Sequence, residues 1–516
     1  MSSPMRRGAP FLTAVTLMAA TAAPATALTA DDLWSQWEAY IEDLGYDVTA
    51  RAEPSGDGLS LRDLTITMPP RAGAGQGGPA TVTLDQVSFV ETADGSVSVR
   101  LPETLPIRMH FEPETGEPVD ITVEQRLVGH SITASGTPDD THYEVSADAM
   151  TLALTSASRM GEPIDIGQVS FTIGALESSA DMSVEDGARV ATQSLNAASL
   201  SYDVDVKNTD PEGEGTLRLK GEMTDITSLG GGTLPEGVDT NDLPAALAAG
   251  YVVDGTLGYG GGTMALAFQQ GPQTLNLRTS SQGGDLKIGL NRDAVVYDVG
   301  VRGLTVQGTG SQMPFPLEFS SSALGLMLSG PLVATETDKP FELGLTLADV
   351  ALPEAVWMMG DPNGRLPHDP LTVRLSVSGL GRFTIDVMDE DAVAAAKEQG
   401  EAPGVIKAIT LDELEIVGAG AEVTGTGAFE VDATRKSAFG DMPLFFGTAD
   451  LRLKGVTGLI STLSEMGVIP AMQAMMIGGT IQQMGKQEGG PDDLSARINV
   501  QEDGNLTVND RPIGLR

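Results

Sequence analysis

The densest group of possible metal ligands is a set of five carboxylates within residues 203–214: Asp203, Asp205, Asp210, Glu212 and Glu214. A hard cation such as Ca²⁺ is bound by several oxygen ligands, so this group could hold calcium. Asp203 and Asp205, however, alternate with apolar residues, which is typical of the hydrated side of a β-strand. The other three would then lie in the turn that follows. We favour the strand and its turn, and keep calcium as the alternative.

The histidines are the other candidates for metal binding or general-base catalysis: His110, His130, His142 and His368. No two of them have the spacing of a zinc motif, and zinc usually recruits several clustered ligands. His130 and His142 could approach each other across a pair of strands. His368 lies in the sequence Pro-His-Asp-Pro, which favours a surface turn over a catalytic base or a zinc ligand. We therefore assign no site to any of them.

Other catalytic chemistry has little support in the sequence. The chain has no cysteine, which excludes thiolate nucleophiles and cysteine-bound metals. The motifs GxSxG, GxxxxGK(S/T) and HExxH are absent. With 71 acidic residues, carboxylates will come close somewhere, so a glycosidase pair cannot be identified from the sequence. We assign no catalytic, cofactor-binding or metal-binding residue, and we expect a protein that is not an enzyme and has no cofactor.

The charge balance limits the partners. Lys plus Arg is 31 and Asp plus Glu is 71, which gives a net charge of −40. Nucleic-acid phosphates repel such a chain, and so do anionic lipid headgroups unless a cation bridges them. We expect no nucleic-acid partner, and we look for partners among lipids and envelope proteins.

The first 27 residues have the three parts of a secretory signal peptide. Arg6 and Arg7 precede a short apolar stretch at 11–23, and Ala25-Thr26-Ala27 is a small-x-small cleavage site. The stretch is shorter than the about 20 residues that span a bilayer. We expect cleavage after Ala27, a periplasmic mature chain, and no transmembrane segment after cleavage.

The composition predicts many strands joined by tight turns, because glycine is abundant (62 residues) and aromatics are only 4%. The mature chain should open with a helix at 31–45, whose apolar stripe packs across a sheet. Thr29 can cap this helix and Gly45 can end it.

Beyond the first helix, the apolar period changes to two, which predicts strands. A slip in the pattern near Arg62-Asp63 suggests a β-bulge. Residues 69–79 are rich in glycine and predict a loop. Residues 87–99 predict a hairpin that turns at Asp94-Gly95, a dipeptide suited to type I′ geometry.

The most regular strands have one apolar and one charged side. This alternation occurs at 202–207 and 217–220, and again at 422–432 and 450–454. It predicts a sheet with water on one side.

A short sequence occurs twice. Leu-Arg-Leu-Lys-Gly stands at 217–221 and again at 451–455. Counting on from each glycine, an isoleucine, two hydroxyl residues and a leucine follow in the same register, at 226–229 and 460–463. The match favours a duplicated scaffold.

Each copy is followed by a short helix that begins with proline, at Pro244 and at Pro470. We therefore divide the mature chain into two related β-rich halves, 28–250 and 251–516.

The C-terminal helix predicted at 470–484 carries methionine mostly on one face: Met472, Met475, Met476 and Met484. Methionine fills irregular apolar space and adapts to varied partners. Such a face could line a groove for acyl chains or contact a partner, but we favour an ordinary core helix.

Residues 357–370, Trp-Met-Met-Gly-Asp-Pro-Asn-Gly-Arg-Leu-Pro-His-Asp-Pro, resemble a signature of exported alphaproteobacterial proteins grouped as the domain-of-unknown-function 2125 family. The helix at 31–45, the turn at 290–298 and the ending from 418 to 509 are also similar. The family's last turn is usually Asn-Gly, whereas this chain has Asn509-Asp510. The resemblance implies a periplasmic β-rich protein without assigned catalytic residues. A more distant similarity, at the level of the fold, is to AsmA-type envelope proteins, whose curved sheets form lipid-accommodating grooves.

The sequence therefore predicts a mainly β protein, with large curved antiparallel sheets in two related halves and a few short helices packed on them. Its first functional hypothesis is a non-enzymatic periplasmic protein that accommodates a lipid or other apolar ligand in envelope maintenance. One alternative is a structural or interaction protein of the cell envelope without a small ligand. The other is a carboxylate-based hydrolase.

Overall fold

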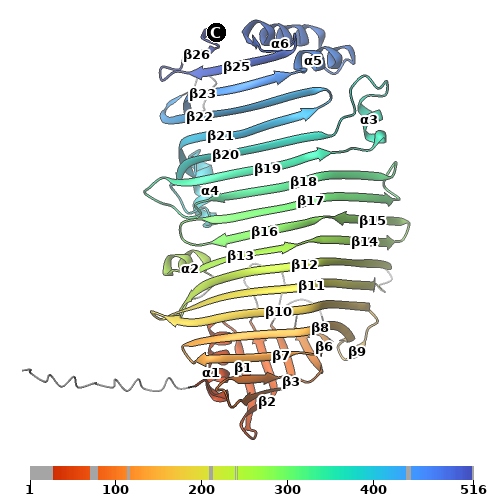
Figure 1. The fold of residues 1–516 in the computed structure, drawn as a ribbon, viewed down its shortest axis with the longest axis vertical. Coiled ribbons are helices and arrows are strands. Elements are labelled where there is room, and N and C mark those ends of the chain that lie inside the picture. The colour runs from red at the N-terminus through yellow and green to blue at the C-terminus, as the bar shows by residue number, and fades with distance from the viewer. Residues whose placement is uncertain are drawn as a thin grey trace, which may run out of the picture.

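The protein is built as one long stack of strands (Figure 1). The computed structural model describes residues 27–69, 79–112, 117–208, 213–238, 240, 242–436 and 443–513. These residues form 27 strands, all in one sheet, and six short helices. The prediction of a mainly β protein with a large antiparallel sheet and few helices is confirmed.

The strands are, in chain order, β1 (Asp47–Pro54), β2 (Gly58–Met68), β3 (Ala80–Glu91), β4 (Val97–Arg100), β5 (Thr104–Phe111), β6 (Val119–Val128), β7 (Ser131–Thr137), β8 (Asp140–Arg159), β9 (Glu162–Pro163), β10 (Gly167–Glu185), β11 (Ala188–Asn208), β12 (Gly215–Pro235), β13 (Val252–Tyr259), β14 (Gly261–Gln270), β15 (Gln273–Ser281), β16 (Gly283–Leu290), β17 (Val295–Gly310), β18 (Leu317–Gly330), β19 (Lys339–Val350), β20 (Leu371–Phe383), β21 (Gly404–Gly418), β22 (Ala421–Lys436), β23 (Pro443–Lys454), β24 (Lys486–Gln487), β25 (Asp493–Val500), β26 (Leu506–Val508) and β27 (Arg511–Ile513). The helices are α1 (Ala30–Asp43), α2 (Leu243–Ala249), α3 (Glu354–Gly360), α4 (Glu390–Gln399), α5 (Val456–Glu465) and α6 (Ala471–Met484).

The strands follow one another up the stack almost in chain order, with α1 and β1–β3 at the lower end of Figure 1 and α5 and α6 at the upper end. Some levels consist of two short strands end to end: β12 pairs with both β13 and β14, and β17 with both β15 and β16. At about 4.8 Å per strand, the stack from β1 to β25 is about 85 Å long. The sheet continues from β12 to β13, which pair with each other on either side of the predicted boundary at residue 250. The division into two related halves stays a prediction.

A crease crosses the strands near their middle. It passes through adjacent positions of β8, β10, β11 and β12, at Asp148, Ala175, Ala198 and Asp225, and again of β17, β18 and β19, at Gly303, Ser322 and Asp349. Four of these residues have a left-handed backbone, with φ between 47° and 57°. One left-handed residue reverses the alternation of side chains, so residues three apart across the crease point to the same face.

The crease bends the sheet toward its apolar side. Leu176, Ala197 and Ile226 are buried beside it, and Ile173 and Met223 pack against them from the other side of the crease. The residues at the bend itself, Ala175, Ala198 and Asp225 among them, are exposed on the opposite face. Apolar residues thus gather on the inside of the bend, which makes the apolar face concave.

The slip predicted near Arg62-Asp63 is a local bend of the same kind, and that prediction is confirmed. Asp63 has φ 52°, and Leu61 and Leu64 on either side of it are both buried. Aspartate tolerates this conformation better than most residues do.

The first helix is also as predicted. Thr29 caps α1, accepting a hydrogen bond from the backbone N–H of Asp32, whose carboxylate in turn accepts from the backbone N–H of Thr29. Gly45, at φ 81°, follows the helix end. This capping box fixes where the chain enters the helix.

Two predicted turns differ from expectation. The hairpin of β3 and β4 forms, but its loop runs over residues 92–96 and only Gly95 has positive φ, so the type I′ prediction was wrong. The last hairpin, between β26 and β27, does have positive φ at both Asn509 (47°) and Asp510 (63°). Asp510 therefore adopts the conformation that glycine usually supplies. The predicted loop at 69–79 falls mostly on residues 70–78, outside the described residues.

The repeated sequence does not have the same structure downstream in its two copies. Residues 226–229 continue the strand β12, whereas residues 460–463 lie in the helix α5. Gly455 has φ 67° and ends its strand, while Gly221 stays within β12 opposite Tyr202. The two proline-led helices, α2 and α6, are both present.

Candidate apolar binding surface

One face of the sheet carries a continuous row of uncharged, mostly apolar residues, each directly opposite the next on the neighbouring strand. We call it the central row: Ile132, Val145, Ser178, Leu195, Ser228, Leu257, Leu286, Val299, Leu326, Leu345, Leu375, Leu414, Gly425, Leu451 and Ala496. It contains no charged residue. Residues two positions away along the strands point to the same side, and from β16 to β23 they are mainly leucine, valine and isoleucine. This side of the sheet is called the apolar face below.

The apolar face is largely uncovered in its middle. Large side chains on it are 40–47% exposed, namely Leu257, Ile288, Tyr297, Leu326, Leu328, Leu343, Ile406 and Ile416. In a two-layered β protein such residues are buried by a second sheet or by helices. Isolated exposed apolar residues are ordinary, but a contiguous set of this kind marks a binding surface.

The opposite face is charged and paired. Arg452 bonds Asp493 at 3.0 Å, Lys454 bonds Glu422 at 2.9 Å, and similar pairs lie on the neighbouring strands. Such exposed ion pairs each contribute little stability, at most about 1 kcal/mol. Their effect is to mark which face of the sheet is in water.

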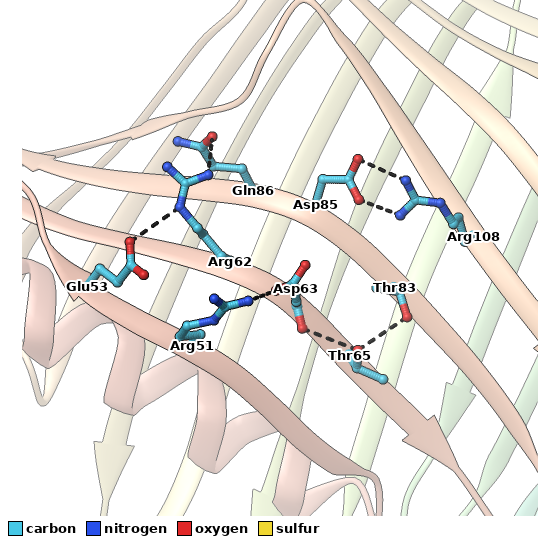
Figure 2. A network of polar contacts seen from close by, with 9 residues as sticks. All are labelled: Arg51, Glu53, Arg62, Asp63, Thr65, Thr83, Asp85, Gln86 and Arg108. Carbon is cyan, nitrogen blue, oxygen red and sulfur yellow. Dashed lines mark hydrogen bonds and ion pairs between the residues drawn. The ribbon is translucent and has the colours of Figure 1, made fainter.

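The same polar character holds at the N-terminal end, where Figure 2 shows a network on β1, β2, β3 and β5. Asp63 pairs with Arg51, and Asp85 binds both terminal nitrogens of Arg108. The hydrogen bond from Arg108 lowers the pKa of Asp85. These carboxylates stand at the outside of the bend, where water and arginine stabilise their charge.

The apolar face is closed at its N-terminal end by α1. Leu33 and Trp34 of the helix are buried against Leu61, Phe89 and other residues of β1–β4. Farther along, Trp37 donates to the hydroxyl of Tyr143 on β8, with Nε1 and Oη 3.2 Å apart. Burial raises the pKa of Tyr143. The helix predicted to pack across a sheet does so, and that prediction is confirmed.

Midway along the apolar face, at one side of the sheet, lies a hollow of about 650 Å³. Leu328, Leu343, Val377 and Ile406 form its floor. Its remaining wall includes Phe341, Phe383 and the residues next to α4: Val387, Ala402 and Pro403. This volume is in the range of pockets that bind small molecules. Its lining surface is mainly apolar, with Glu342 and Arg382 as the charged residues around it.

At the C-terminal end, the helix α6 differs from the prediction. Met472 and Met475 are 77% exposed and Met476 is 61% exposed, so the prediction of an ordinary core helix was wrong. Only Ala474 of this helix is buried. The helix rests on the sheet by its last turn, where Asn509 donates to the carbonyl of Met484 at 2.8 Å. Because the sheet has no second layer here, the methionine side chains have nothing to pack against.

Asp203 and Asp205 of the acidic cluster lie on a strand, as predicted. Asp203 pairs with Lys220 at 3.1 Å and Asp205 with Arg218 at 3.0 Å, across β11 and β12 on the charged face. Asp210 and Glu212 lie outside the described residues. Among the residues that are described, no group of three or more acidic and histidine side chains is arranged to hold a metal.

His130 and His142 do not meet. On the β7–β8 pair His142 lies opposite Ser135, five residues from His130, so the suggested approach was wrong. Instead, His142 Nδ1 lies 2.7 Å from Asp181, and His110 Nδ1 lies 2.7 Å from Asp120. These are cross-strand pairs on the hydrated face.

Both pairs make a pH-dependent contribution to stability. The hydrogen bond to Asp120 raises the pKa of His110, and the bond to Asp181 raises that of His142, from an ordinary value of 6.5. The stability that comes from a raised histidine pKa is fully present below pH 6.5 and is lost as the pH rises through the folded-state pKa.

We expect NMR titration to place the midpoints of both His110 and His142 above 6.5. Asp181→Asn should lower only the midpoint of His142 and Asp120→Asn only that of His110; a variant that leaves its own histidine unchanged contradicts the assignment.

His368 is more buried than a surface turn implies. Its ring is stacked on Trp357 at 4.6 Å, and its Nδ1 lies 3.0 Å from Glu354. Next to it, Asp361 is 1% exposed and accepts a hydrogen bond from the backbone N–H of Leu366 at 2.6 Å, which lowers its pKa. These contacts fasten the loop after α3 onto that helix. Most residues of the signature at 357–370 therefore serve packing and turn formation.

Sequence reasoning found the one-sided strands but missed that their apolar side is uncovered. The sequence did indicate an uncovered face, because the few short helices that it predicts could not cover so many apolar strands. The hollow beside α4 combines residues from five separate segments, and no local pattern indicates it.

Among the described residues no helix is long and apolar enough to span a membrane. The predicted signal peptide lies outside them, apart from Ala27. Models of known protein families give no match to this chain, and no curated protein matches it significantly.

Proposed function

We propose that this protein binds the acyl chains of a lipid along its apolar face, between β13 and β23. The observation that carries the proposal is the uncharged central row, on which and beside which large apolar side chains are 40–47% exposed. Covering such a surface is favourable by roughly 25 cal/mol per Å² of apolar area removed from water. An acyl chain supplies that cover without needing hydrogen bonds from the sheet.

The shape of the face favours a chain-like ligand over a second sheet. Two sheets pack well when both are evenly twisted and about 10 Å apart. The crease bends the sheet toward this face at β8–β12 and also crosses β17–β19, and a hollow of about 650 Å³ opens on the face. A flexible chain can follow the concavity and place one end in the hollow.

The signal-peptide features at residues 1–27 support a location outside the cytoplasm for this activity. The protein would then hold or carry lipid in the envelope without changing it chemically. An interaction protein without a small ligand is the alternative, in which the apolar face would be covered by a protein partner.

Site-specific photo-crosslinking tests the proposal. Tyr297 is 40% exposed on the apolar face, so p-benzoylphenylalanine can replace it with little change of shape. In cells grown with labelled fatty acid, irradiation should transfer label to this protein. Extraction and mass spectrometry of the adduct identify the lipid.

The matched control is the same amino acid in place of Asp298. It is the next residue of β17, and its side chain lies on the charged face opposite Lys287. Equal labelling at 297 and 298, or none at 297, argues against lipid on the apolar face. A protein adduct at 297 would support the interaction protein instead.

A further inference from the structure

We propose that the helix pair α5–α6 docks on the surface of a lipid bilayer. The inference deepens the proposed function and rests on it, because a bilayer is the source of the acyl chains. The helix pair adds a surface by which the protein contacts that bilayer.

The exposed surface of the pair is strongly apolar. Val468 is 62% exposed, Met472, Met475 and Met476 are 61–77% exposed, and Ile477 beside them is 45% exposed. They lie on α6 and on the short loop before it, and α5 packs against α6. Large apolar side chains this exposed are in unfavourable contact with water, and a ligand or partner that covers them lowers the free energy.

The local charge fits a bilayer. From 456 to 485 the only charged residue is Glu465, whereas one residue in five of the whole chain is charged. A chain of net charge −40 is held off a membrane wherever its carboxylates are dense. The helix pair has few carboxylates, Glu465 and the Asp492 that binds the first turn of α5 among them, so approach there costs little of that repulsion.

The chemistry of the surface favours lipid over a protein partner. Specific protein interfaces are enriched in aromatic residues, methionine and arginine, of which the aromatic residues and arginine give directional contacts. Residues 456–485 contain methionine but no aromatic residue and no arginine. Methionine, valine and isoleucine offer only non-directional contact, which is what the acyl boundary of a bilayer provides.

The pair also adjoins the end of the apolar face. Leu494 of β25 stands opposite Leu453 on that face, and it is 2% exposed because the chain just after α6 covers it. A Cβ placed on Gly485 would lie 3.1 Å from the Leu494 Cβ. The helix pair therefore lies next to the apolar face, at the end of the sheet opposite α1.

Single-site fluorescence tests the docking. The chain has no cysteine, so Met475→Cys in the chain from Leu28 to Arg516 takes one environment-sensitive dye without further changes. On addition of phosphatidylcholine vesicles we expect a blue shift and at least a twofold rise in intensity. Met160→Cys, at a methionine that is 68% exposed elsewhere, should give no change. An unchanged spectrum at 475, or equal changes at both positions, overturns the proposal.

Vesicle flotation tests the side chains themselves. Replacing Met472, Met475 and Met476 together with glutamine keeps a good helix former and removes the apolar surface. The bound fraction should fall at least tenfold, while Met160→Gln with Leu229→Gln, at residues 68% and 61% exposed, leaves it unchanged. Adding anionic lipid should weaken binding. Binding that survives the triple substitution, or that rises with anionic lipid, overturns the proposal.

The outcome is separable from that of the proposed function. Lipid crosslinked at position 297 without vesicle binding leaves the apolar face as a lipid site and removes only the docking role. Vesicle binding without crosslinked lipid does the reverse, and then the helix pair is a membrane contact of a protein that carries no lipid.

Discussion

Phe89→Ala is expected to lower the free energy of unfolding at the N-terminal end of the sheet by about 3–5 kcal/mol. Phe89 is 0% exposed and its ring meets Trp37 edge to face, with centroids 5.1 Å apart. Its strand neighbours, Leu59 and Val99, are buried as well. Truncation leaves a cavity that this tightly packed end cannot close.

The loss should be local. In a stack of strands each level contacts mainly the levels next to it, so stability is transmitted from neighbour to neighbour. Hydrogen exchange measured by mass spectrometry should show faster exchange in α1 and β1–β4, with β17–β23 unaffected. Uniform loss of protection along the whole sheet would mean that it unfolds as one unit and would contradict this description.

Phe171→Ala is the matched control. Phe171 is the same residue on the open part of the apolar face, and it is 42% exposed. Its truncation removes little buried surface, so a cost below about 1 kcal/mol is expected. A cost as large as that of Phe89→Ala would show that the apolar face is covered in solution, for instance by a second copy of the chain.

Local chemistry made the ends and bends of elements predictable. Thr29 followed by Asp32 is a capping box whichever sheet the helix packs on, and it determined the start of α1 correctly. The slip at Arg62-Asp63 was visible because the apolar side of a strand must stay on one face of the sheet. When the apolar pattern shifts by one residue while the same face of the sheet stays buried, the backbone must change its conformation at that residue.

The remaining wrong predictions depend on which distant part of the chain packs against a residue. The methionines of α6 have the spacing of a core helix, and only the absence of an opposing layer leaves them exposed. In the same way, Leu217-Gly221 and Leu451-Gly455 are identical in sequence, but their glycines differ in φ. Gly221 is held in β12 between β11 and β14, whereas Gly455 turns the chain into α5. Partners distant in sequence decide these outcomes.

Leu343→Glu is expected to reduce the lipid that purifies with the protein at least about tenfold, because a charge moved into hydrocarbon costs about 2.5–3.5 kcal/mol and each 1.4 kcal/mol is a factor of ten. Leu343 is 41% exposed between Leu328 and Val377, and it lines the hollow beside α4. In the empty protein the new carboxylate can stay hydrated, so the fold should survive. A bound acyl chain would bury the same carboxylate, and only the bound state is penalised.

Thr346→Glu separates this effect from that of charge alone. Thr346 lies on the same strand but on the charged face, directly opposite Arg374. It adds the same charge to β19 without touching the apolar face, so native mass spectrometry should find lipid bound as in the unmodified protein. Loss of lipid in both variants would point to general repulsion of the ligand by an acidic protein. Retention in both would place the lipid elsewhere, because a carboxylate on the floor of an occupied hollow has no route to water.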